Sequence, residues 1–493
     1  MCKLENILPR ATGITCDSRK VKAGFIFVAV QGHKFDGNMF IDDAISRGAI
    51  AIVTDSKKIN LGVPTFLVKN ARQALSRLAA EFYNHPSREL QLVGITGTNG
   101  KTTIAHMTEH IFRSHGFNTG LIGTLEVNLG KTSHASTLTT PDAAELQYYF
   151  RNMRQNGVTH AAMEVSAQGI DMNRTDDVSF TCGIISNITK DHLDFYADFK
   201  SYVNTKKHFL HLLNPGTPLV INVDDKFCQD IAANYSGMLI TISLFTKDAD
   251  ISAEIISTST YGSNIRVNIN NQINLASGLI ILPEQLELKL IIPGHHNIQN
   301  ALLAIAAGLL AGLPLTTIGK ALSEFKSVDR RMTVFHLEGR TIVDDTALNP
   351  GSINAVFETI RHMRFKRLIV ANAVRGSRGT QINSDNAEVL AKWQQHLPFT
   401  LLVTSSTEAV DPLNIVTTEE LRTFIQTLHF LNADYTYIAS LHETIVHAYE
   451  LTSPGDLLLL IGAQGMDKGR QILTALSRLE CINPLLSSSC PFL

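Results

Sequence analysis

The stretch GITGTNGKTT, residues 94–103, follows the apolar run LQLV and precedes the helix-forming segment TTIAHMTEHIFRSHG. A buried strand, a glycine loop and a helix in this order are typical of a phosphate-binding loop, although its upstream glycine, Gly97 or Gly94, departs slightly from the usual spacing. The glycines let backbone N–H groups approach phosphate oxygens, Lys101 supplies a positive charge, and the Thr102 hydroxyl can bind Mg²⁺. A plain glycine turn before a helix is the alternative, and the Lys-Thr pair favours nucleotide binding. The predicted nucleotide-binding residues are Gly97, Thr98, Asn99, Gly100, Lys101, Thr102 and Thr103.

The chain is too long for one hydrophobic core, since it has 493 residues. The polar segment NHPSREL ends a first stretch of short strands and helices, and the pattern resets again near KSVDRRM. Strands alternate with helices on both sides of these breaks, which predicts an α/β fold with parallel sheets. We therefore expect three domains, covering residues 1–88, 89–330 and 331–493.

Composition excludes several classes of partner. Hydrophobic residues make up 44% of the chain, charged residues 18%, and the formal net charge is −2, so no basic excess points to nucleic acid. The most apolar run, LLLLIG at 457–462, is too short to cross a membrane, and the start MCKLENILPR lacks the pattern of a secretory signal. Six cysteines without a CxxC pair fit reduced thiols in a cytoplasmic protein.

Two polar segments downstream of the glycine loop could bind a metal. MEVSAQGI places Glu164 at the end of a predicted strand, and NITKDHLDFY carries Asn187, Asp191 and His192. Carboxylate and imidazole groups at strand ends are plausible Mg²⁺ ligands, whereas each residue taken alone could equally cap a helix or lie on the surface.

Several motifs together resemble the Mur ligase family, over nearly the whole chain. They are GTNGKT, LTTPD (138–142), MEVSAQGI, NITKDHLDFY, YVNTKKHFL and PGHHNIQNALLAIAA. The N-terminal segment CDSRKVKAGFIFVAVQGHKFDGNMF is most similar to the subgroup that adds the third residue of the peptidoglycan stem peptide, the UDP-N-acetylmuramoyl-tripeptide synthetases. The resemblance implies a central P-loop ATPase domain with a parallel sheet, flanked by an N-terminal UDP-binding α/β domain and a C-terminal Rossmann-like α/β domain that binds the amine.

The resemblance also implies roles for individual residues. Lys101, Glu164, His192 and Lys206 would be catalytic, and Lys206 would carry a carbamate formed from CO₂. This reaction requires a neutral amine, hence a lysine whose pKa is lowered; on its own, the segment would be read as a solvated basic helix face. Two Mg²⁺ ions would be held by Thr102, Glu164, His192 and the carbamoylated Lys206. ATP would also contact Asn297, Asn300, Arg331, Asp344 and Asp345, and the nucleotide-sugar substrate would contact Ser18, Arg19, Thr139, Thr140, Ser166 and Arg174.

The C-terminal segment departs from the third-residue subgroup. IVDDTALNPGSINAV resembles a motif of the ligase that adds the terminal dipeptide, and VTSSTEAVDP lacks the arginine of the subgroup's amino-acid-selecting DNPR motif. The glycine-rich segment ANAVRGSRGTQIN offers Arg375 and Arg378, which could clamp a carboxylate or could form a solvated turn. These differences leave the amine substrate open.

The leading hypothesis is an ATP-dependent, ADP-forming amide ligase of cell-wall precursor synthesis. It would act as a monomer in the cytoplasm, on a UDP-MurNAc-dipeptide and an amino acid, without nucleic-acid or membrane partners. A second hypothesis is a related ligase or cyclase acting on a carboxylate outside peptidoglycan, of the folylpolyglutamate or tetrapyrrole-modifying type. A third is a non-enzymatic nucleotide-binding scaffold, against which the intact Lys101, Glu164, His192 and Lys206 argue.

Overall fold

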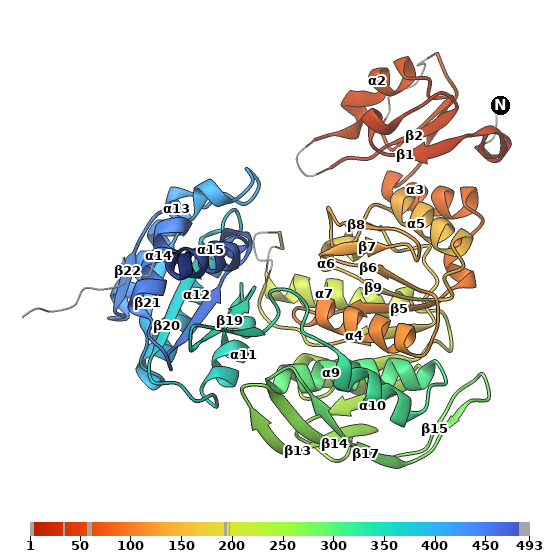
Figure 1. Cartoon of the computed structure of the whole chain (residues 1–493). Helices are drawn as coiled ribbons and strands as arrows, with labels where there is room; N and C mark the ends of the chain where they lie inside the picture. Colours follow the sequence, from red (N-terminus) through yellow and green to blue (C-terminus); the bar gives the residue numbers. More distant parts are fainter. Residues whose placement is uncertain (1–3, 33–34, 57–61, 192–194, 197, 483–493) are drawn as a thin grey trace, which may run out of the picture.

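The computed structural model describes residues 4–32, 35–56, 62–191, 195–196 and 198–482. Figure 1 shows three sheet-containing regions that follow one another along the chain, with the N-terminal region above the central one and the C-terminal region beside it. None of the helices in the described part of the chain combines the length and the apolar character needed to cross a membrane.

The N-terminal region is built on a small parallel sheet with the order β1-β2-β3-β4. Its central strands are buried, as their runs of β-branched and aromatic residues predict. Helix α3 packs on this sheet and also contacts helix α5 of the central region, so the two regions share a small apolar cluster. The elements are β1 (Gly13–Thr15), β2 (Phe25–Ala29), α2 (Ile41–Ser46), β3 (Ala51–Thr54), β4 (Thr65–Leu67), α3 (Ala71–Phe82) and α5 (Ala143–Gln155).

The central region is an eleven-stranded sheet with the order β17-β14-β13-β12-β11-β10-β5-β9-β6-β7-β8. Its middle strands are parallel and almost wholly buried, because helices cover both faces. Strand β5 lies in the middle and leads directly into helix α4, as the sequence predicts. The parallel strands are β5 (Gln91–Thr96), β6 (Thr119–Ile122), β9 (His160–Glu164), β10 (Cys182–Ile185), β11 (Leu219–Asn222) and β12 (Leu239–Ser243); the helices are α4 (Lys101–Ser114), α6 (Ala167–Asp171), α7 (Phe199–His208), α8 (Lys226–Asn234), α9 (His295–Leu310) and α10 (Leu315–Glu324).

The middle of the central sheet is parallel, as predicted, and both of its edges are extended by antiparallel strands. Short turns join β6 to β7, β7 to β8 and β13 to β14, and a tight hairpin can only pair its strands in opposite directions, whereas residues 270–283 separate β14 from β17. Residues 250–292 supply most of this extension. The edge strands are β7 (Glu126–Asn128), β8 (Ser133–Ala135), β13 (Ile251–Ser259), β14 (Gly262–Ile269) and β17 (Glu284–Leu290), and a separate hairpin joins β15 (Ile273–Asn274) to β16 (Ile280–Ile281).

The C-terminal region has a six-stranded sheet with the order β18-β19-β23-β20-β21-β22, parallel except for β18. Strand β23 is the apolar run LLLLI, and its position at the centre of the sheet explains why it is buried on both faces. The elements are β18 (Thr333–Leu337), β19 (Arg340–Asp345), α11 (Pro350–Ile360), β20 (Leu368–Ala373), α12 (Thr380–His396), β21 (Thr400–Thr404), α13 (Thr418–Phe430), β22 (Tyr435–Tyr437), α14 (Leu441–Leu451), β23 (Leu457–Ile461) and α15 (Gly469–Ile482).

The central and C-terminal regions share one apolar core. It runs from Ile298 and Leu302 on α9 to Ile353, Val356 and Phe357 on α11. This shared core places the start of α11 beside the glycine loop. The packing of α11 therefore determines which C-terminal residues lie near that loop.

Candidate active site

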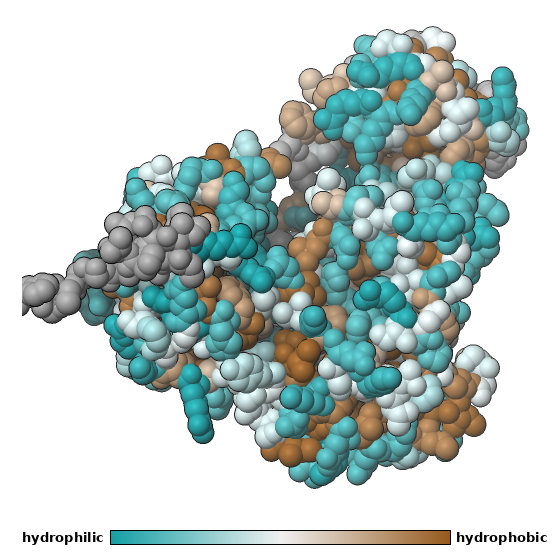
Figure 2. Space-filling view, in the orientation of Figure 1, coloured by the Kyte–Doolittle hydropathy of each residue, from teal (hydrophilic) through white to brown (hydrophobic). Residues whose placement is uncertain are grey.

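A cavity of about 1360 Å³ lies where the three regions meet. Figure 2 shows the molecule hollowed between the C-terminal lobe and the rest of the chain. The cavity is lined by Cys16, Val30 and Arg72 from the N-terminal region, by the glycine loop and the ends of several central strands, and by C-terminal residues that include Asp345, Leu348, Arg375, Arg378, Asn414 and Gln464.

The glycine loop forms a close-fitting turn between β5 and α4. Gly97 and Gly100 both have positive φ, 138° and 88°, a conformation that favours glycine. A Cβ atom at Gly97 would lie 2.0 Å from Ser186 Oγ, and one at Gly100 would lie 2.4 Å from Asn300 Oδ1. Lys101 Nζ donates to the carbonyl oxygens of Gly97 and Thr98, each at 2.8 Å, so the ammonium group lies over the loop. The geometry is that of a phosphate-binding turn.

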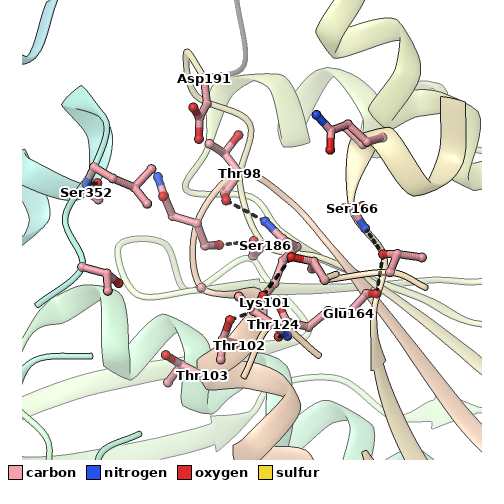
Figure 3. Close-up of a pocket in the computed structure, with 18 of the residues that line it drawn as sticks. Thr98, Lys101, Thr102, Thr103, Thr124, Glu164, Ser166, Ser186, Asp191 and Ser352 are labelled. Atoms are coloured by element: carbon pink, nitrogen blue, oxygen red, sulfur yellow. Dashed lines mark hydrogen bonds between the residues drawn. The ribbon is translucent and has the colours of Figure 1, made fainter. Parts of the chain in front are cut away.

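Glu164, at the end of β9, stands opposite the start of α4. Its carboxylate accepts hydrogen bonds from Thr102 Oγ1 (3.0 Å), from Thr124 Oγ1 (3.0 Å) and from the Thr124 backbone N–H (2.7 Å). Figure 3 shows these side chains converging beside Lys101. Glu164 and Thr102 are buried and Thr124 is exposed, and together they present a group of oxygen atoms, the donor type that Mg²⁺ prefers.

Lys206 reaches the same loop from helix α7. Its side chain is 1% exposed, and Nζ donates to Thr96 Oγ1 at 2.9 Å and to the Gly97 carbonyl oxygen at 3.0 Å. Burial, together with the neighbouring Lys101 charge, lowers the pKa of Lys206 well below its ordinary value. Burial also lowers the pKa of Lys101, against the opposing influence of Glu164 and Asp191. The lowered pKa makes the neutral amine, the form that reacts with CO₂, more accessible at Lys206 than at an ordinary lysine.

The C-terminal region contacts the glycine loop through a buried polar network. Asn349 caps helix α11, and its side-chain amide pairs with that of Asn99 through two hydrogen bonds of 3.0 and 3.2 Å. Asn349 Nδ2 also donates to Asp191 Oδ2 at 3.0 Å. Arg375 forms an ion pair of 2.7 Å with Asp191 Oδ1. These four side chains connect the glycine loop to the C-terminal region.

The residues predicted to contact ATP divide into two groups. Asn297, Asn300, Arg331 and Asp345 line the cavity. Asp344 does not line it, because its side chain is fully buried and is bound by Arg330. Burial raises the pKa of Asp345 to about 6, although the nearby Arg331 charge opposes the shift.

The residues predicted to contact the nucleotide sugar also divide. Thr139, Thr140, Ser166 and Arg174 all line the cavity. Thr140 Oγ1 accepts from the Ser166 N–H (2.9 Å) and donates to the Glu164 carbonyl oxygen (3.0 Å), and Arg174 donates to the Thr140 carbonyl oxygen (2.6 Å). Ser18 and Arg19 lie outside the cavity lining, and the exposed Arg19 side chain pairs with Asp17. The N-terminal residues that line the cavity are Cys16, Val30, Gly32, Arg72 and Leu75.

The side-chain oxygen atoms around Glu164 indicate whether this part of the cavity suits a metal ion. The described residues hold no group of three or more His, Cys, Asp or Glu side chains suited to a metal ion. His192, predicted as a metal ligand, lies outside the described residues. The oxygen atoms of Glu164, Thr102 and Thr124 nevertheless fit a hard cation that completes its coordination with phosphate and water.

Sequence reasoning missed Asn349 as a site residue and left the role of Arg375 undecided. The segment LNPGS does carry a local signal, since an asparagine before a proline is typical of a helix N-cap. Nothing in that signal indicates that the cap also pairs with a side chain 250 residues earlier. The contact depends on how α11 packs against α9.

Three family models match successive parts of the chain. They are described as Mur ligase family, catalytic domain (residues 10–83), Mur ligase middle domain (95–308), and Mur ligase, glutamate ligase domain (330–464). In the solved MurF ligase from Thermotoga maritima in complex with ADP, the fold matches with a TM-score of 0.67 at 18% identity, over 96% of this chain and 98% of that one.

Two curated relatives match over most of their length, and both are named UDP-N-acetylmuramoyl-L-alanyl-D-glutamate–2,6-diaminopimelate ligase. That of Caldanaerobacter subterraneus subsp. tengcongensis is 30% identical over 453 residues, covering 92% of this chain and 89% of the relative. That of Bacillus velezensis is 31% identical over 474 residues, covering 94% and 91%. The chain belongs to the Mur ligase family and is an ATP-dependent, ADP-forming ligase.

Proposed function

We propose that the protein adds an amino acid to the free carboxylate of a UDP-MurNAc-dipeptide during peptidoglycan precursor synthesis. One observation carries the proposal: a single cavity joins the N-terminal region, the glycine loop and the C-terminal loops. This arrangement suits three substrates that must meet at one reaction centre. The names of the full-length relatives support the choice of acceptor.

The chemistry follows from the weak electrophilicity of a carboxylate. A carboxylate oxygen of the dipeptide attacks the γ-phosphorus of ATP, and the bond from that phosphorus to ADP breaks. The amine nitrogen then attacks the carbonyl carbon of the acyl phosphate, loses a proton and expels phosphate. Lys101 stabilises negative charge on the transferred phosphoryl group.

We propose that Thr102 and Glu164 hold Mg²⁺, together with His192 and a carbamate on Lys206, so that the site binds two ions. When bound, Mg²⁺ would neutralise negative charge on the phosphate groups of ATP. The burial of Lys206 and its lowered pKa support carbamate formation, in which the neutral amine forms a bond from its nitrogen to CO₂ and releases a proton. The oxygen atoms around Glu164 support the metal assignment.

Two further sets of cavity-lining residues are proposed to bind the substrates, and a polar network is proposed to hold the C-terminal region closed over them. We propose that Asn297, Asn300, Arg331 and Asp345 contact ATP, and that Thr139, Thr140, Ser166 and Arg174 contact the nucleotide sugar; their place in the cavity lining supports both sets. The network of Asn99, Asp191, Asn349 and Arg375 holds the C-terminal region against the loop and excludes water, which would hydrolyse the acyl phosphate. All three walls come from one chain, which supports a monomer, and the use of ATP supports a cytoplasmic location.

The test is phosphate release from ATP with Mg²⁺, bicarbonate and UDP-MurNAc-L-Ala-D-Glu. A panel of amino acids is supplied in turn, and products are identified by mass spectrometry. We expect release that requires both the nucleotide sugar and one amino acid, with the mass of the new amide in the product. If ATP binds but no amino acid gives release with this acceptor, the proposal is wrong and a carboxylate outside peptidoglycan becomes the substrate to seek.

A further inference from the structure

A second cavity lies at the C-terminal ends of helices α3 and α5, where the N-terminal region meets the central one. Its volume is about 380 Å³, which is in the range of pockets that bind small organic ligands. Figure 1 shows α3 and α5 side by side between the two regions. We call this cavity the α3–α5 pocket, and it is lined by Phe82, Tyr83, Asn84, Arg151, Arg154 and Gln155.

The two arginines of the α3–α5 pocket differ in their partners. Arg154 forms an ion pair with Glu89. Arg151 has no carboxylate within ion-pair distance among the described residues, and its guanidinium lies over the Tyr83 ring, 5.7 Å from the ring centroid. Because the two arginines are three residues apart on α5, their side chains project from the same face of the helix. The pocket therefore holds one positive charge, on Arg151, that no described carboxylate pairs with.

Aromatic rings and amide side chains supply the rest of the pocket wall. Tyr83 is half-buried, and its ring centroid lies 4.7 Å from that of Phe82 and 6.1 Å from that of Tyr148. The side chains of Asn84 and Gln155 are exposed and make no hydrogen bond to another described residue. Aromatic rings pack well against planar groups, and amides both donate and accept hydrogen bonds. This wall suits a ligand that has a planar ring and polar substituents.

Backbone hydrogen bonds fix the rim of the pocket. Helix α3 ends in a Schellman motif, in which the His85 N–H donates to the Ala80 carbonyl oxygen (2.7 Å) and the Asn84 N–H donates to that of Glu81 (3.1 Å). Asn84 has the positive φ, 59°, that this motif requires of its capping residue. The pocket is thus formed before a ligand binds, which reduces the entropy lost on binding.

Both helices of the pocket also reach the active-site cavity. Arg72 and Leu75, in the first turns of α3, line that cavity, and so do Asp142 and Ala143 at the start of α5. Leu75 and Ala143 belong to one buried apolar cluster, so the two helices are packed together. The 12 residues of α3 span about 18 Å between the two cavities. A ligand that changes how the C-terminal ends of the helices pack can therefore shift the wall of the active-site cavity.

We propose that the α3–α5 pocket binds a small anion that carries a planar ring, and that this ligand is an effector of the active-site cavity. Arg151 binds the carboxylate or phosphate group through its parallel N–H groups, and Tyr83 packs against the ring. The ligand connects α3 to α5, so it favours the arrangement in which N-terminal residues line the active-site cavity. The pocket uses no residue assigned to ATP or to the nucleotide sugar, so the inference does not depend on the proposed function.

The first experiment measures binding by ligand-observed saturation-transfer NMR on the full chain, with ADP and Mg²⁺ present to fill the glycine loop. Benzoate and phenyl phosphate are the ring-bearing anions, acetate and inorganic phosphate supply the anion alone, and benzamide supplies the ring alone. The proteins are wild type, Arg151→Gln, Tyr83→Leu and the matched control Arg77→Gln, which alters an exposed arginine on α3 outside both cavities. Melting temperatures by circular dichroism report on folding.

We expect benzoate or phenyl phosphate to bind wild type and Arg77→Gln with equal affinity, and the tighter of the two identifies the anionic group. Arg151→Gln should raise the dissociation constant about tenfold or more, as loss of a charge-assisted hydrogen bond predicts, and Tyr83→Leu should raise it about threefold to tenfold. Acetate and inorganic phosphate should bind wild type about tenfold more weakly, because they lack the ring. Benzamide should bind wild type and Arg151→Gln equally weakly, and the melting temperatures should agree.

The second experiment tests the effector role by hydrogen–deuterium exchange and mass spectrometry. With the ring-bearing anion bound, backbone amides in the first turns of α3 and α5 should exchange about twofold more slowly or better in wild type. The same anion should leave exchange in Arg151→Gln unchanged. This measurement needs no substrate of the ligase, so it can succeed or fail independently of the proposed function.

Three binding results would overturn the inference. They are the absence of saturable binding of benzoate and phenyl phosphate to wild type, equal affinity of these anions for wild type and Arg151→Gln, and an equal loss for benzamide. Slower exchange confined to residues 80–90 and 148–156 would overturn the effector role, because it would show that binding does not reach the active-site cavity.

Discussion

The glycine loop and the C-terminal loops use polar side chains in opposite ways. Around the glycine loop, Thr102, Glu164 and Lys206 are buried and Lys101 is half-buried, and all four hydrogen-bond to one another or to residues of the loop and its preceding strand. In the C-terminal wall, Glu420 and Asp411 are engaged in holding two loops, while Arg378 remains without an ion pair among the described residues. The difference teaches that side chains at the glycine loop satisfy one another without a ligand, whereas the C-terminal wall leaves one half-buried guanidinium outside any ion pair among the described residues.

The largest effect is expected at Lys101. Its ammonium group is the charge nearest the phosphate-binding turn, so Lys101→Ala should lower the rate of phosphate release about 10³-fold. Folding should be preserved, because the substitution removes a half-buried charge whose pKa is lowered by desolvation. Steady-state phosphate release and thermal melting measure the two quantities. A variant with near-normal activity would show that the glycine loop does not bind the reacting phosphates.

Substitution of Lys206 tests whether the residue carries a carbamate that activity requires. Lys206→Gln should lower activity about 10²- to 10³-fold, whereas Lys207→Gln, which alters its exposed neighbour, should not. Removing dissolved CO₂ and bicarbonate should slow the wild type and restoring them should recover it, with no response from Lys206→Gln. Equal activity of wild type with and without bicarbonate would contradict carbamate formation.

Asp345 should make stability depend on pH. Its pKa is raised from 3.8 to about 6, so the folded state binds the proton more tightly than the unfolded state. The stabilisation from this proton is full below pH 3.8 and is lost as pH rises through 6. The free energy of unfolding of the wild type, relative to Asp345→Asn, should therefore fall by roughly 2 kcal/mol between pH 4 and pH 7. Urea unfolding at both pH values measures the difference, and a constant difference would contradict the raised pKa.

The smallest effect is expected at the connection between the two regions. Asn349→Ser keeps a side chain able to cap α11 but removes the amide that pairs with Asn99 and Asp191. We expect activity to fall about tenfold, since the lost hydrogen bonds are worth roughly 1 kcal/mol each. Small-angle X-ray scattering with an ATP analogue should show a larger radius of gyration for the variant. An unchanged radius together with unchanged activity would show that this network does not control closure.

The sequence predicted the parts of the site that are local in the chain. The glycine loop around Gly97 and Lys101 was predicted from residues that are close together in the sequence. The structure confirms strand β5 before this loop and helix α4 after it. Alternating strand and helix patterns likewise predicted three α/β regions, because apolar periodicity reflects burial directly. The antiparallel edges were less predictable, since pairing direction depends on which strands become neighbours.

Side-chain partners across long separations could not be predicted in this way. Residues that are close in sequence and alike in chemistry have different surroundings in the folded chain. Arg375 forms an ion pair with Asp191, whereas Arg378 lines the cavity without one among the described residues. Asp344 is bound by Arg330, whereas Asp345 lines the cavity. Strand alternation sends consecutive side chains to opposite faces, and only packing decides which face meets the cavity.

The sequence by itself determined that a glycine loop joins a buried strand to a helix and that the chain folds as successive α/β regions. Those properties arise from local geometry and from the burial pattern of single elements. The tertiary structure alone decided that Asn349 meets Asn99 and that Arg378, not Arg375, remains available in the cavity. These contacts depend on how α11 packs against the central region and on how Glu420 holds a loop more than forty residues before it, and neither relation is encoded in a short segment.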